Sequence, residues 1–345
     1  MSEGAPSARL NALSLSRCVP VLVTAELTRR CPLSCLHCYL PETRGRAARP
    51  PELPTAEWKR ILSGLAAAGG LYLVFTGGEP LLRPDLAELC RHAGELRFDV
   101  RVFSTGHGLT PELAAELKEA GVSAFEMSFY GSPAVHDRVT GVRGAFARSL
   151  AAARLLKMKG VAVKMKTPLM TLNAGQAGRL KRLAALEGFS ISFDLSIAPG
   201  NDGDGAALGY RLSGAALRRA VRQVYGGAKG PEKTPEEGFQ EGFICGAGRN
   251  VCAVGPSGEL YPCLQLPVKL GNLARRSFPA LWRDSAWLER WRGLSGKDLR
   301  GCAGCKDAGY CGLCPGLNLL ETGDPLKPPP RTCEAASVLR AAAGK

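Results

Sequence analysis

Three cysteines, Cys31, Cys35 and Cys38, form a C-x3-C-x2-C loop directly after an apolar run that is typical of a strand. The spacing is too tight for a disulfide framework. Soft thiolates suit iron–sulfur chemistry, and three of them can each hold one iron of a [4Fe–4S] cluster. The fourth iron then keeps an open position, as a catalytic zinc does. The triplet therefore predicts a reactive cluster, although a zinc knuckle or a pair of redox thiols would use the same residues.

A second motif, Gly77-Gly78-Glu79-Pro80, follows the apolar run at 71–75. Glycine allows a ligand to approach the backbone closely because it has no side chain. At this separation the two motifs resemble those of the radical S-adenosylmethionine (SAM) enzymes. In that family the open iron binds the amino and carboxylate groups of SAM, and the glycine motif lies along its amino group. The resemblance implies that all four motif residues contact the cofactor.

Further cofactor contacts are implied less strongly. His37 and Tyr39 flank the last cysteine of the loop, where the family places a residue against the adenine. Ser128 stands where many relatives carry S-x-D for the ribose, but Tyr130 replaces the acidic residue here. His107 replaces an asparagine that often follows the third strand. Taken alone, each of these residues is more often a solvated loop residue than a ligand contact.

The chain between the motifs alternates apolar runs with amphipathic segments, which predicts parallel βα units. Strands are expected at 19–28, 71–75, 99–104, 122–129, 161–167 and 189–197. These six units match the partial (βα)6 barrel of the radical SAM family. We expect residues 1–17 to be a flexible tail and residues 18–228 to form the radical SAM core.

The fifth strand has two different faces. Val161, Val163 and Met165 point one way, while Lys164 and Lys166 point the other. If the apolar face meets the helices, the lysines point into the barrel, where they could hold a carboxylate of cofactor or substrate. If the strand lies at the open edge of the barrel, the lysines are merely solvated.

The last part of the chain, 229–345, is dense in cysteine and has few strand signals. Its eight thiols are the number that two fully ligated [4Fe–4S] clusters require. They occur as C-x2-C-x5-C-x2-C with flanking cysteines, and the pattern resembles the loop-rich SPASM domain of radical enzymes that modify peptides and proteins. The resemblance implies one auxiliary cluster on Cys245, Cys252, Cys263 and Cys314. It implies a second on Cys302, Cys305, Cys311 and Cys333.

Two zinc sites would satisfy the same number of thiols, so zinc is an alternative for this region. The two remaining cysteines, Cys18 and Cys90, belong to no motif and are expected to be buried as small apolar residues. Either one would also be a candidate hydrogen donor to a substrate radical.

The composition sets the context. The chain has 345 residues, 13 cysteines and a formal net charge of +14. It shows no signal peptide and no apolar run that could span a bilayer, so we expect a protein of the reducing cytoplasm without a membrane partner. Its basic residues are widely spread and only 6% of the chain is aromatic, so no nucleic-acid partner is expected. A basic surface would still favour an acidic peptide or protein.

The resemblance implies a mechanism with three [4Fe–4S] clusters and SAM. An electron enters the cluster on the N-terminal triplet, SAM is cleaved, and the 5′-deoxyadenosyl radical abstracts a hydrogen from the substrate. Two fully ligated auxiliary clusters favour a net oxidation, such as a crosslink in a ribosomally made peptide during natural-product maturation. We expect an electron donor of the flavodoxin or ferredoxin type. The stretch before the barrel is too short for a leader-binding domain, so a separate leader-binding protein is expected.

Three alternatives share parts of this pattern. A radical enzyme that modifies a haem precursor has the same layout. A sulfatase-type protein maturase carries an aspartate after the Y-P-C cysteine, whereas this chain has Leu264 there. A zinc or electron-transfer scaffold without enzymatic activity would have no use for the two SAM-binding motifs.

Overall fold

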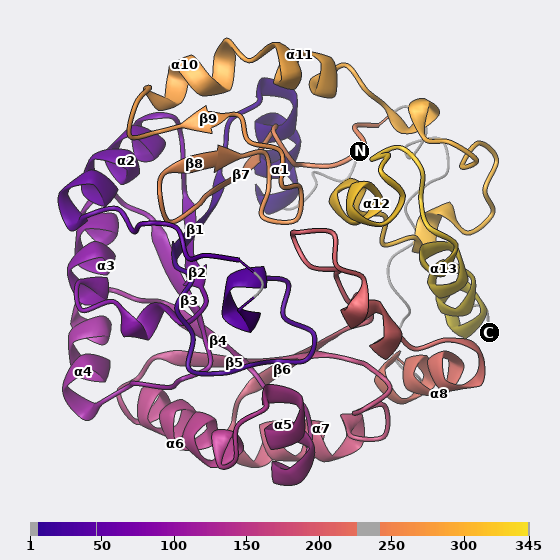
Figure 1. The fold of residues 1–345 in the computed structure, drawn as a ribbon, viewed down its shortest axis with the longest axis horizontal. Helices are drawn as coiled ribbons and strands as arrows, with labels where there is room; N and C mark the ends of the chain where they lie inside the picture. Colours follow the sequence, from indigo (N-terminus) through magenta and orange to yellow (C-terminus); the bar gives the residue numbers. More distant parts are fainter. Residues whose placement is uncertain (1–5, 46, 226–241, 344–345) are drawn as a thin grey trace.

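A computed structural model describes residues 6–45, 47–225 and 242–343. A parallel sheet curves through the centre of the molecule, and its first six strands follow in chain order (Figure 1). These strands are β1 (Leu22–Thr28), β2 (Tyr72–Gly77), β3 (Asp99–Ser104), β4 (Ala124–Ser128), β5 (Ala162–Pro168) and β6 (Ser190–Asp194). This is the predicted partial barrel of the radical SAM fold.

Helices form an arc around the outside of the strands (Figure 1). They are α2 (Thr55–Ala67), α3 (Leu86–Glu95), α4 (Pro111–Glu119), α5 (Pro133–Thr140), α6 (Ala145–Met158), α7 (Ala177–Glu187) and α8 (Gly214–Tyr225). Several of these helices begin at a residue whose side chain or ring favours a helix start. In α4, for example, the Thr110 hydroxyl accepts a hydrogen bond from Leu113 N, and Pro111 occupies the first turn.

The strands turn their apolar residues toward the helices. Val100 and Val102 of β3 are fully buried, while Arg101 between them faces the interior of the barrel. In β5, Val163 and Met165 are buried in the same core. The period of two along β3 and β5 therefore leaves polar side chains in the interior of the barrel, inside an apolar shell.

The sheet continues into the cysteine-rich part of the chain. Strand β7 (Val251–Val254) pairs in parallel with β1, and β8 (Glu259–Tyr261) and β9 (Gly271–Asn272) follow as antiparallel strands. These strands are few and short, as the weak strand signals of this region predict, and they form by adding to an existing sheet edge, which needs little propensity of their own. Around them lie α10 (Phe278–Arg283), α11 (Ala286–Arg292), α12 (Pro315–Thr322) and α13 (Pro330–Ala343).

The N-terminal segment departs from the prediction of a flexible tail. Residues Pro6–Arg17 form helix α1, which carries alanine and leucine and no internal glycine or proline. Asn250 donates hydrogen bonds to Asn11 Oδ1 and Ser14 Oγ at 2.9 and 3.1 Å, which ties α1 to the loop before β7. The predicted boundary at 228/229 lies outside the described residues.

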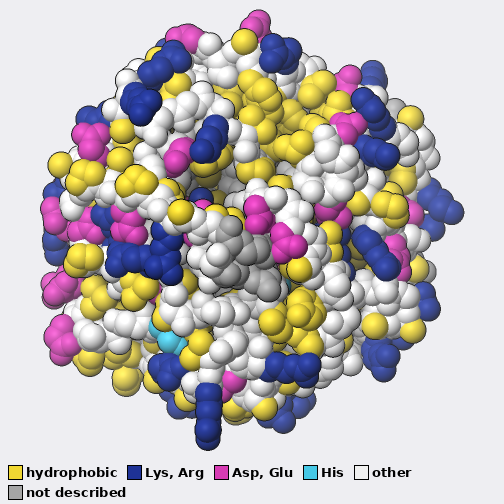
Figure 2. Space-filling model, viewed as in Figure 1, with side chains coloured by type: hydrophobic (Ala, Val, Ile, Leu, Met, Phe, Trp, Pro, Cys, Tyr) yellow, Lys and Arg dark blue, Asp and Glu magenta, His cyan; other side chains and the backbone are white. Residues whose placement is uncertain are grey.

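Charge is distributed evenly over the face of the molecule shown in Figure 2, where lysine and arginine side chains surround the rim and alternate with acidic ones. No helix in the described ranges is long and apolar enough to cross a membrane.

Candidate iron–sulfur and cofactor site

The cysteine loop follows the carboxyl end of β1, and hydrogen bonds from several other segments hold it in place. Ser34 N donates to Thr140 O, and Leu36 N donates to Val139 O, both at 2.9 Å, so the end of α5 holds the loop. Asn201 N donates to Tyr39 O at 2.8 Å from the segment after β6. The loop is therefore held from two sides of the barrel mouth, where the carboxyl ends of all six strands converge.

The three thiols of the loop lie close together. Burial, and after it the charge of Glu79 and the thiol of Cys38, raise the pKa of Cys31 to about 12. The pKa of Cys35 is raised further by burial and by the thiols of Cys38 and Cys31. Cys31 and Cys35 are therefore poor thiolates in the bare protein, and they become good ones when iron takes the place of their protons. This donor set fits a cluster with one open iron.

Close packing against the backbone requires glycine at both positions of the second motif. A β-carbon on Gly77, where φ is +136°, would lie 2.3 Å from the carbonyl oxygen of Thr28. One on Gly78 would lie 2.2 Å from the carbonyl oxygen of Arg30. The motif packs directly against the residues that lead into Cys31, so its glycines set the distance between β2 and the cysteine loop.

Glu79 occupies an internal position. Its side chain is fully buried and accepts hydrogen bonds from Leu81 N at 3.1 Å, Ser104 Oγ at 2.7 Å and Thr105 N at 2.7 Å, as well as from the Thr105 hydroxyl. Burial raises the pKa of Glu79, although these donors oppose the shift. With four donors on two oxygens, the carboxylate joins the ends of β2 and β3. Pro80 begins the short 3₁₀ helix Pro80–Leu82 and is also buried.

The weaker sequence candidates gather on one side of the loop. The rings of His37 and Tyr130 meet edge to face, with 5.0 Å between their centroids. Hydrogen bonds link the Tyr130 side chain to Ser128 and to the thiol of Cys35. The Tyr39 hydroxyl instead donates to Glu26 Oε1 at 2.7 Å. The structure therefore brings His37 and Ser128 together beside the triplet and turns Tyr39 toward β1.

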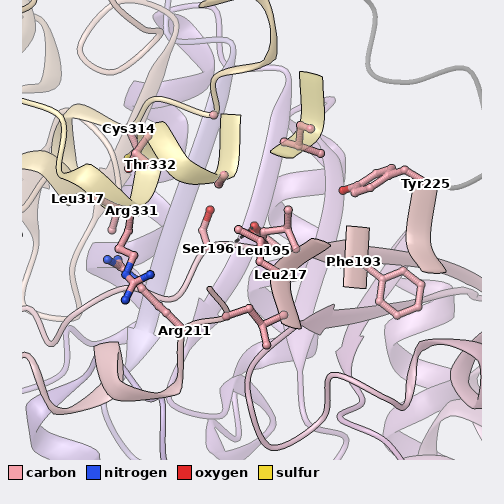
Figure 3. A pocket seen from close by; sticks show the side chains of 15 residues that line it. Phe193, Leu195, Ser196, Arg211, Leu217, Tyr225, Cys314, Leu317, Arg331 and Thr332 are labelled. Atoms are coloured by element: carbon pink, nitrogen blue, oxygen red, sulfur yellow. Dashed lines mark hydrogen bonds between the residues drawn. The ribbon is translucent and has the colours of Figure 1, made fainter. Parts of the chain in front are cut away.

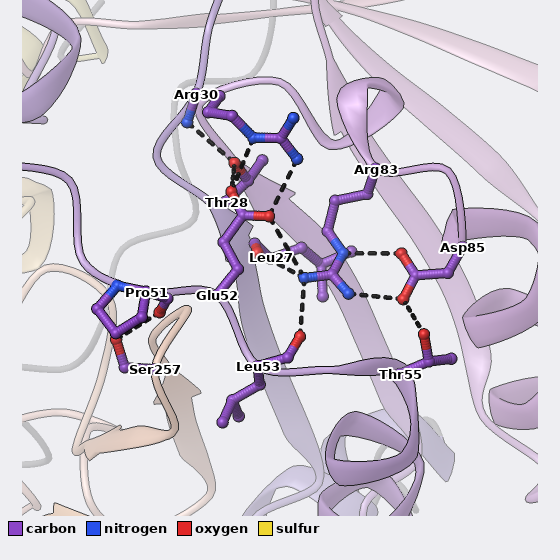
Figure 4. Close-up of polar contacts among 10 residues, drawn as sticks. All are labelled: Leu27, Thr28, Arg30, Pro51, Glu52, Leu53, Thr55, Arg83, Asp85 and Ser257. Carbon is purple, nitrogen blue, oxygen red and sulfur yellow. Dashed lines mark hydrogen bonds and ion pairs between the residues drawn. The ribbon is translucent and has the colours of Figure 1, made fainter.

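The loop before α2 braces the start of the cysteine loop (Figure 4). Glu52 accepts two hydrogen bonds from the Arg30 guanidinium, at 2.9 and 3.0 Å, and one from the Thr28 hydroxyl at 2.5 Å. Arg83 donates to Leu53 O at 3.1 Å. Ser257, in the turn between β7 and β8, donates to Pro51 O at 2.8 Å. The β7–β8 hairpin is therefore connected to the residue that precedes Cys31.

The lysines of β5 lie in the barrel interior. Strand β5 pairs with β4 on one side and with β6 on the other, so the alternative that it forms the open edge is wrong. Lys166 Nζ lies 3.0 Å from Glu126 Oε2 of β4 and 4.6 Å from the ring centroid of Phe103. Its side chain is 44% exposed, so the ammonium group stays accessible from the mouth.

The first C-terminal group of thiols is anchored in the sheet. Cys252 belongs to β7 and is fully buried. Burial, and after it the thiols of Cys263 and Cys314, raise the pKa of Cys245 to about 12. Cys263 in turn lies close to Cys252. The structure thus brings together the four thiols that the resemblance places around one auxiliary cluster.

The second group lies on loops and on α13. Burial, and after it the thiols of Cys333 and Cys302, raise the pKa of Cys311 to about 11. The pKa of Cys302 is raised by burial and by Cys333 and Cys305. Cys333 is exposed and the others are half-buried. These four thiols also form one neighbourhood, but they have less protein around them.

Among the residues that the structure covers, no three histidine, cysteine or carboxylate side chains are grouped as the ligands of one metal ion. Tetrahedral zinc holds all of its sulfur ligands on a single ion, whereas a [4Fe–4S] cluster places each thiolate on a different iron.

The two cysteines outside the motifs lie away from the mouth. Cys90 in α3 is fully buried in the core. Cys18 precedes the amino end of β1, whereas the triplet follows its carboxyl end, and the seven strand residues between them span about 23 Å. Neither thiol is placed to donate hydrogen to a substrate in the mouth.

A cavity of 250 Å³ opens between the cysteine loop and the β7–β9 hairpin. Its wall includes Glu26 and Arg29, at and after the end of β1, and Glu42 from the 3₁₀ helix Pro41–Arg44. Leu264 and Tyr261 close it from the opposite side. Sequence reasoning missed this group. The feature of the sequence that could have indicated this group is Glu26, a carboxylate in a strand, 22–28, whose other residues are apolar or small.

A second cavity, of 180 Å³, lies where β6 and α8 meet α12 and α13 (Figure 3). Phe193, Leu217 and Leu317 give it apolar walls, and Cys314 is part of its lining. Arg211 bridges the two halves of the molecule here, with both terminal nitrogens 2.6 Å from the Glu321 carboxylate.

Two family models match this chain. Residues 25–181 match the radical SAM superfamily, and residues 245–306 match SPASM, described as an iron–sulfur cluster-binding domain. An AdoMet-dependent heme synthase of Methanosarcina barkeri is 28% identical over 90% of this chain and 95% of its own length. A PqqA peptide cyclase of Ruegeria pomeroyi is 37% identical, but over 48% of this chain and 44% of its own length.

Solved structures share the fold. Streptococcus suis SuiB bound to precursor peptide SuiA aligns over 93% of this chain and 78% of its own, with a TM-score of 0.68 at 17% identity. The enzyme anSMEcpe with bound AdoMet and the Kp18Cys peptide aligns over 93% and 96%, with a TM-score of 0.71 at 16% identity. Together with the two motifs and the paired thiol groups, the family matches show a radical SAM domain followed by a SPASM iron–sulfur domain, and the solved structures show the same fold.

Proposed function

We propose that this enzyme modifies a ribosomally made peptide and that the product is an oxidative crosslink. The observation that carries the proposal is the cavity of 250 Å³ whose lining includes Glu42, four residues after Cys38, and Leu264, directly after Cys263. Its volume is below the range of about 300–1,000 Å³ that holds a whole drug-sized ligand. It suits one or two side chains of a peptide whose remaining length stays outside.

The cofactor sites would be held by the groups described above. Cys31, Cys35 and Cys38 would hold the SAM-binding cluster, and the two C-terminal groups of thiols would hold auxiliary clusters. When bound, this cluster and SAM supply the 5′-deoxyadenosyl radical that removes a hydrogen atom from the substrate. Lys166, exposed at the mouth beside Ser128, is positioned to bind a carboxylate of cofactor or substrate.

The protein's own part is to orient the substrate and keep the site ordered. The contacts of Glu79 and Glu52 fix the two strand ends that face the cofactor. Leu264 and Tyr261 restrict access of water from the side of the hairpin. The interior Glu126 is paired with Lys166, so it balances that charge within the barrel.

The second candidate is the modification of a haem precursor. It is favoured by the heme synthase relative, which aligns over nearly the whole chain, whereas the peptide cyclase relative aligns over half. Against it stands the lining of the cavity, where the carboxylates of Glu26, Glu42 and Asp202 outnumber the cations of Arg29 and Lys269. Propionate groups of a tetrapyrrole would meet net negative charge there.

The test is mass spectrometry of candidate substrates after anaerobic incubation with enzyme, reductant and SAM. The peptides encoded beside this gene are one set, and an iron-porphyrin precursor of haem is the other. A crosslinked peptide is expected to lose two mass units, and deuterium at its reacting carbon should appear in 5′-deoxyadenosine. An unchanged peptide mass with one deuterium gained from heavy water would indicate epimerisation. Conversion of the porphyrin alone would establish the second candidate.

A further inference from the structure

Two neighbouring helices depart from the mixed charge of the surface in Figure 2. Five exposed arginines on them form what we call the α7–α8 face: Arg179, Arg182, Arg218, Arg219 and Arg222. The only acidic residue in either helix is Glu187, at the end of α7, and it binds Arg154 of α6. Among the described residues, no ion pair joins any of the five arginines to a carboxylate. The α7–α8 face is therefore a basic surface without balancing charge.

The opposite charge gathers elsewhere on the arc of helices. Helix α4 carries Glu112, Glu116 and Glu119 against one cation, Lys118. The basic character of the α7–α8 face is therefore local, and it does not simply follow from the net charge of +14. A local field of one sign attracts a partner of the opposite sign and orients it before contact.

The α7–α8 face is also hollowed. A cavity of 460 Å³ is lined by Gly175, Gly178, Arg179 and Arg182 of the start of α7 and the loop before it, and by Gln223 of α8. A β-carbon on Gly178 would lie 3.6 Å from Arg182 Nη1, so this guanidinium group leans over the glycine. A carboxylate side chain that entered the hollow would meet two guanidinium groups, whose planar donors match its two oxygens.

Helix α8 connects this face to the second group of C-terminal thiols. Helix α13, which carries the exposed Cys333, packs along α8 in a shared apolar cluster (Figure 1). The first residue of α8, Gly214, donates from its N–H to Oε1 of Glu334, the residue after Cys333, at 2.7 Å. Lys181 Nζ of α7 donates to two carbonyls at the end of α8, at 2.9 and 3.0 Å. Because α8 has 12 residues and is about 18 Å long, a protein that covers it reaches the exposed thiols.

We propose that the α7–α8 face is the docking surface for a small acidic electron carrier of the flavodoxin or ferredoxin type. Its charge complements the five arginines, and its own carboxylates fit the hollow. A nucleic acid or an acidic peptide would also suit the charge, but neither would use the exposed thiol group beside it. That neighbourhood favours a partner that exchanges electrons.

This inference rests on the proposed oxidative crosslink, which removes two hydrogens from the substrate. One leaves as a hydrogen atom to the 5′-deoxyadenosyl radical. The other leaves as a proton, which passes to solvent, and an electron, which passes to the auxiliary cluster sites. The docked carrier, in its oxidised form, accepts that electron at the exposed thiol group and becomes reduced by one electron.

The test measures the binding of the reconstituted enzyme to an oxidised flavodoxin and to a plant-type ferredoxin by isothermal titration calorimetry. Wild-type affinity should fall as salt is added, because salt screens exposed charges. The double variant Arg218→Glu, Arg222→Glu should bind at least one carrier about tenfold more weakly. The matched control is Arg275→Glu, Arg276→Glu, which makes the same change in net charge in the exposed turn after β9 and should keep the wild-type affinity.

A second measurement separates docking from damage to the clusters. Reduced enzyme is mixed with oxidised flavodoxin, and the semiquinone is followed by stopped-flow absorbance. Its formation should slow about tenfold in the α8 double variant and stay unchanged in the control. A small neutral quinone needs no charged docking surface, so it should oxidise all three proteins at the same rate.

Equal weakening in the control, or no binding of either carrier to wild type, would overturn the assignment. Tighter binding of a single-stranded oligonucleotide or a polyglutamate peptide to the same arginines would assign the face to another class of partner. These outcomes are distinct from those of the proposed function. Crosslinking is measured on the peptide itself, and carrier binding would be seen even if the substrate were a haem precursor.

Discussion

The cysteine loop at the barrel mouth and the second C-terminal group of thiols differ in how firmly the surrounding protein holds them. The loop is fastened to α5, to the segment after β6 and to Glu52, and its neighbour Glu79 is saturated with hydrogen bonds. The second group, Cys302, Cys305, Cys311 and Cys333, is half-buried or exposed and lies on turns and one helix.

This difference indicates which of the sites is ordered in the absence of an iron–sulfur cluster. The barrel site has its own hydrogen bonds and buried core, so its geometry does not depend on a cluster. The second group has little apolar surface to bury, so cluster binding must supply much of the free energy that orders it. The first group lies between these extremes, since Cys252 belongs to the sheet.

The largest effect should come from Cys31→Ala. Two remaining thiolates cannot hold the cluster that binds SAM, so formation of 5′-deoxyadenosine should fall to background. Because the barrel is ordered by its own contacts, circular dichroism should stay close to wild type. Residual SAM cleavage at a tenth of the wild-type rate, measured by chromatography, would contradict the role of the triplet.

Cys305→Ala should lower the iron content by one cluster, from about twelve to about eight irons per chain. SAM cleavage should continue slowly without coupling to product. Iron analysis and amide hydrogen exchange check this, and faster exchange should be confined to the second thiol group and α13. Wild-type product formation would show that the second auxiliary cluster is dispensable, and iron near four with bound zinc would show that the C-terminal thiols are zinc sites.

Gly78→Ala tests the close contact of the barrel motif with the chain before Cys31. The added β-carbon would lie 2.2 Å from a backbone carbonyl oxygen that cannot move without displacing the loop. We expect a loss of about 3 kcal/mol in the free energy of unfolding, the upper end for overpacking. Gly64→Ala is the matched control, because nothing lies within 4 Å of that position in α2 and alanine should stabilise the helix by up to about 1 kcal/mol. Equal effects in urea titrations would refute the packing argument.

His136 gives a smaller effect that depends on pH. Burial lowers the pKa of this histidine to about 4, from its ordinary value of 6.5. As pH falls from 7 to 5 the unfolded chain takes up a proton that the native state does not, so stability should fall by about 2 kcal/mol. His136→Gln should remove this component from denaturant titrations at the two pH values. An unchanged pH dependence would mean that His136 takes up its proton over the same pH range in the native barrel as in the unfolded chain.

Much of the site could be predicted from the sequence because its residues are close neighbours along the chain. The Cys31 triplet and the glycine motif each lie in one short loop after one apolar run, so local pattern fixes both the ligand type and the strand that carries it. The alternation of Val163 and Met165 with the lysines of β5 likewise predicted the face that lies against the helices.

Other features could not be found in this way, since they depend on segments distant in sequence. The pairing of β7 with β1 needs an exposed strand edge, which no local pattern encodes. Helix α1 was mistaken for a tail because its anchor, Asn250, lies more than two hundred residues away. The role of Glu52 and the internal hydrogen bonds of Glu79 were not predicted because their partners come from other strands and loops.

The sequence by itself therefore determined the chemistry: thiols at cluster spacing, glycines at a strand end and eight further cysteines in the last third of the chain. Only the tertiary structure decided where that chemistry acts. It placed Glu42 of the segment after the cysteine loop and Leu264, which follows Cys263, in the wall of one cavity. Ligand type is a property of single residues, whereas a cavity arises only when separate elements pack together.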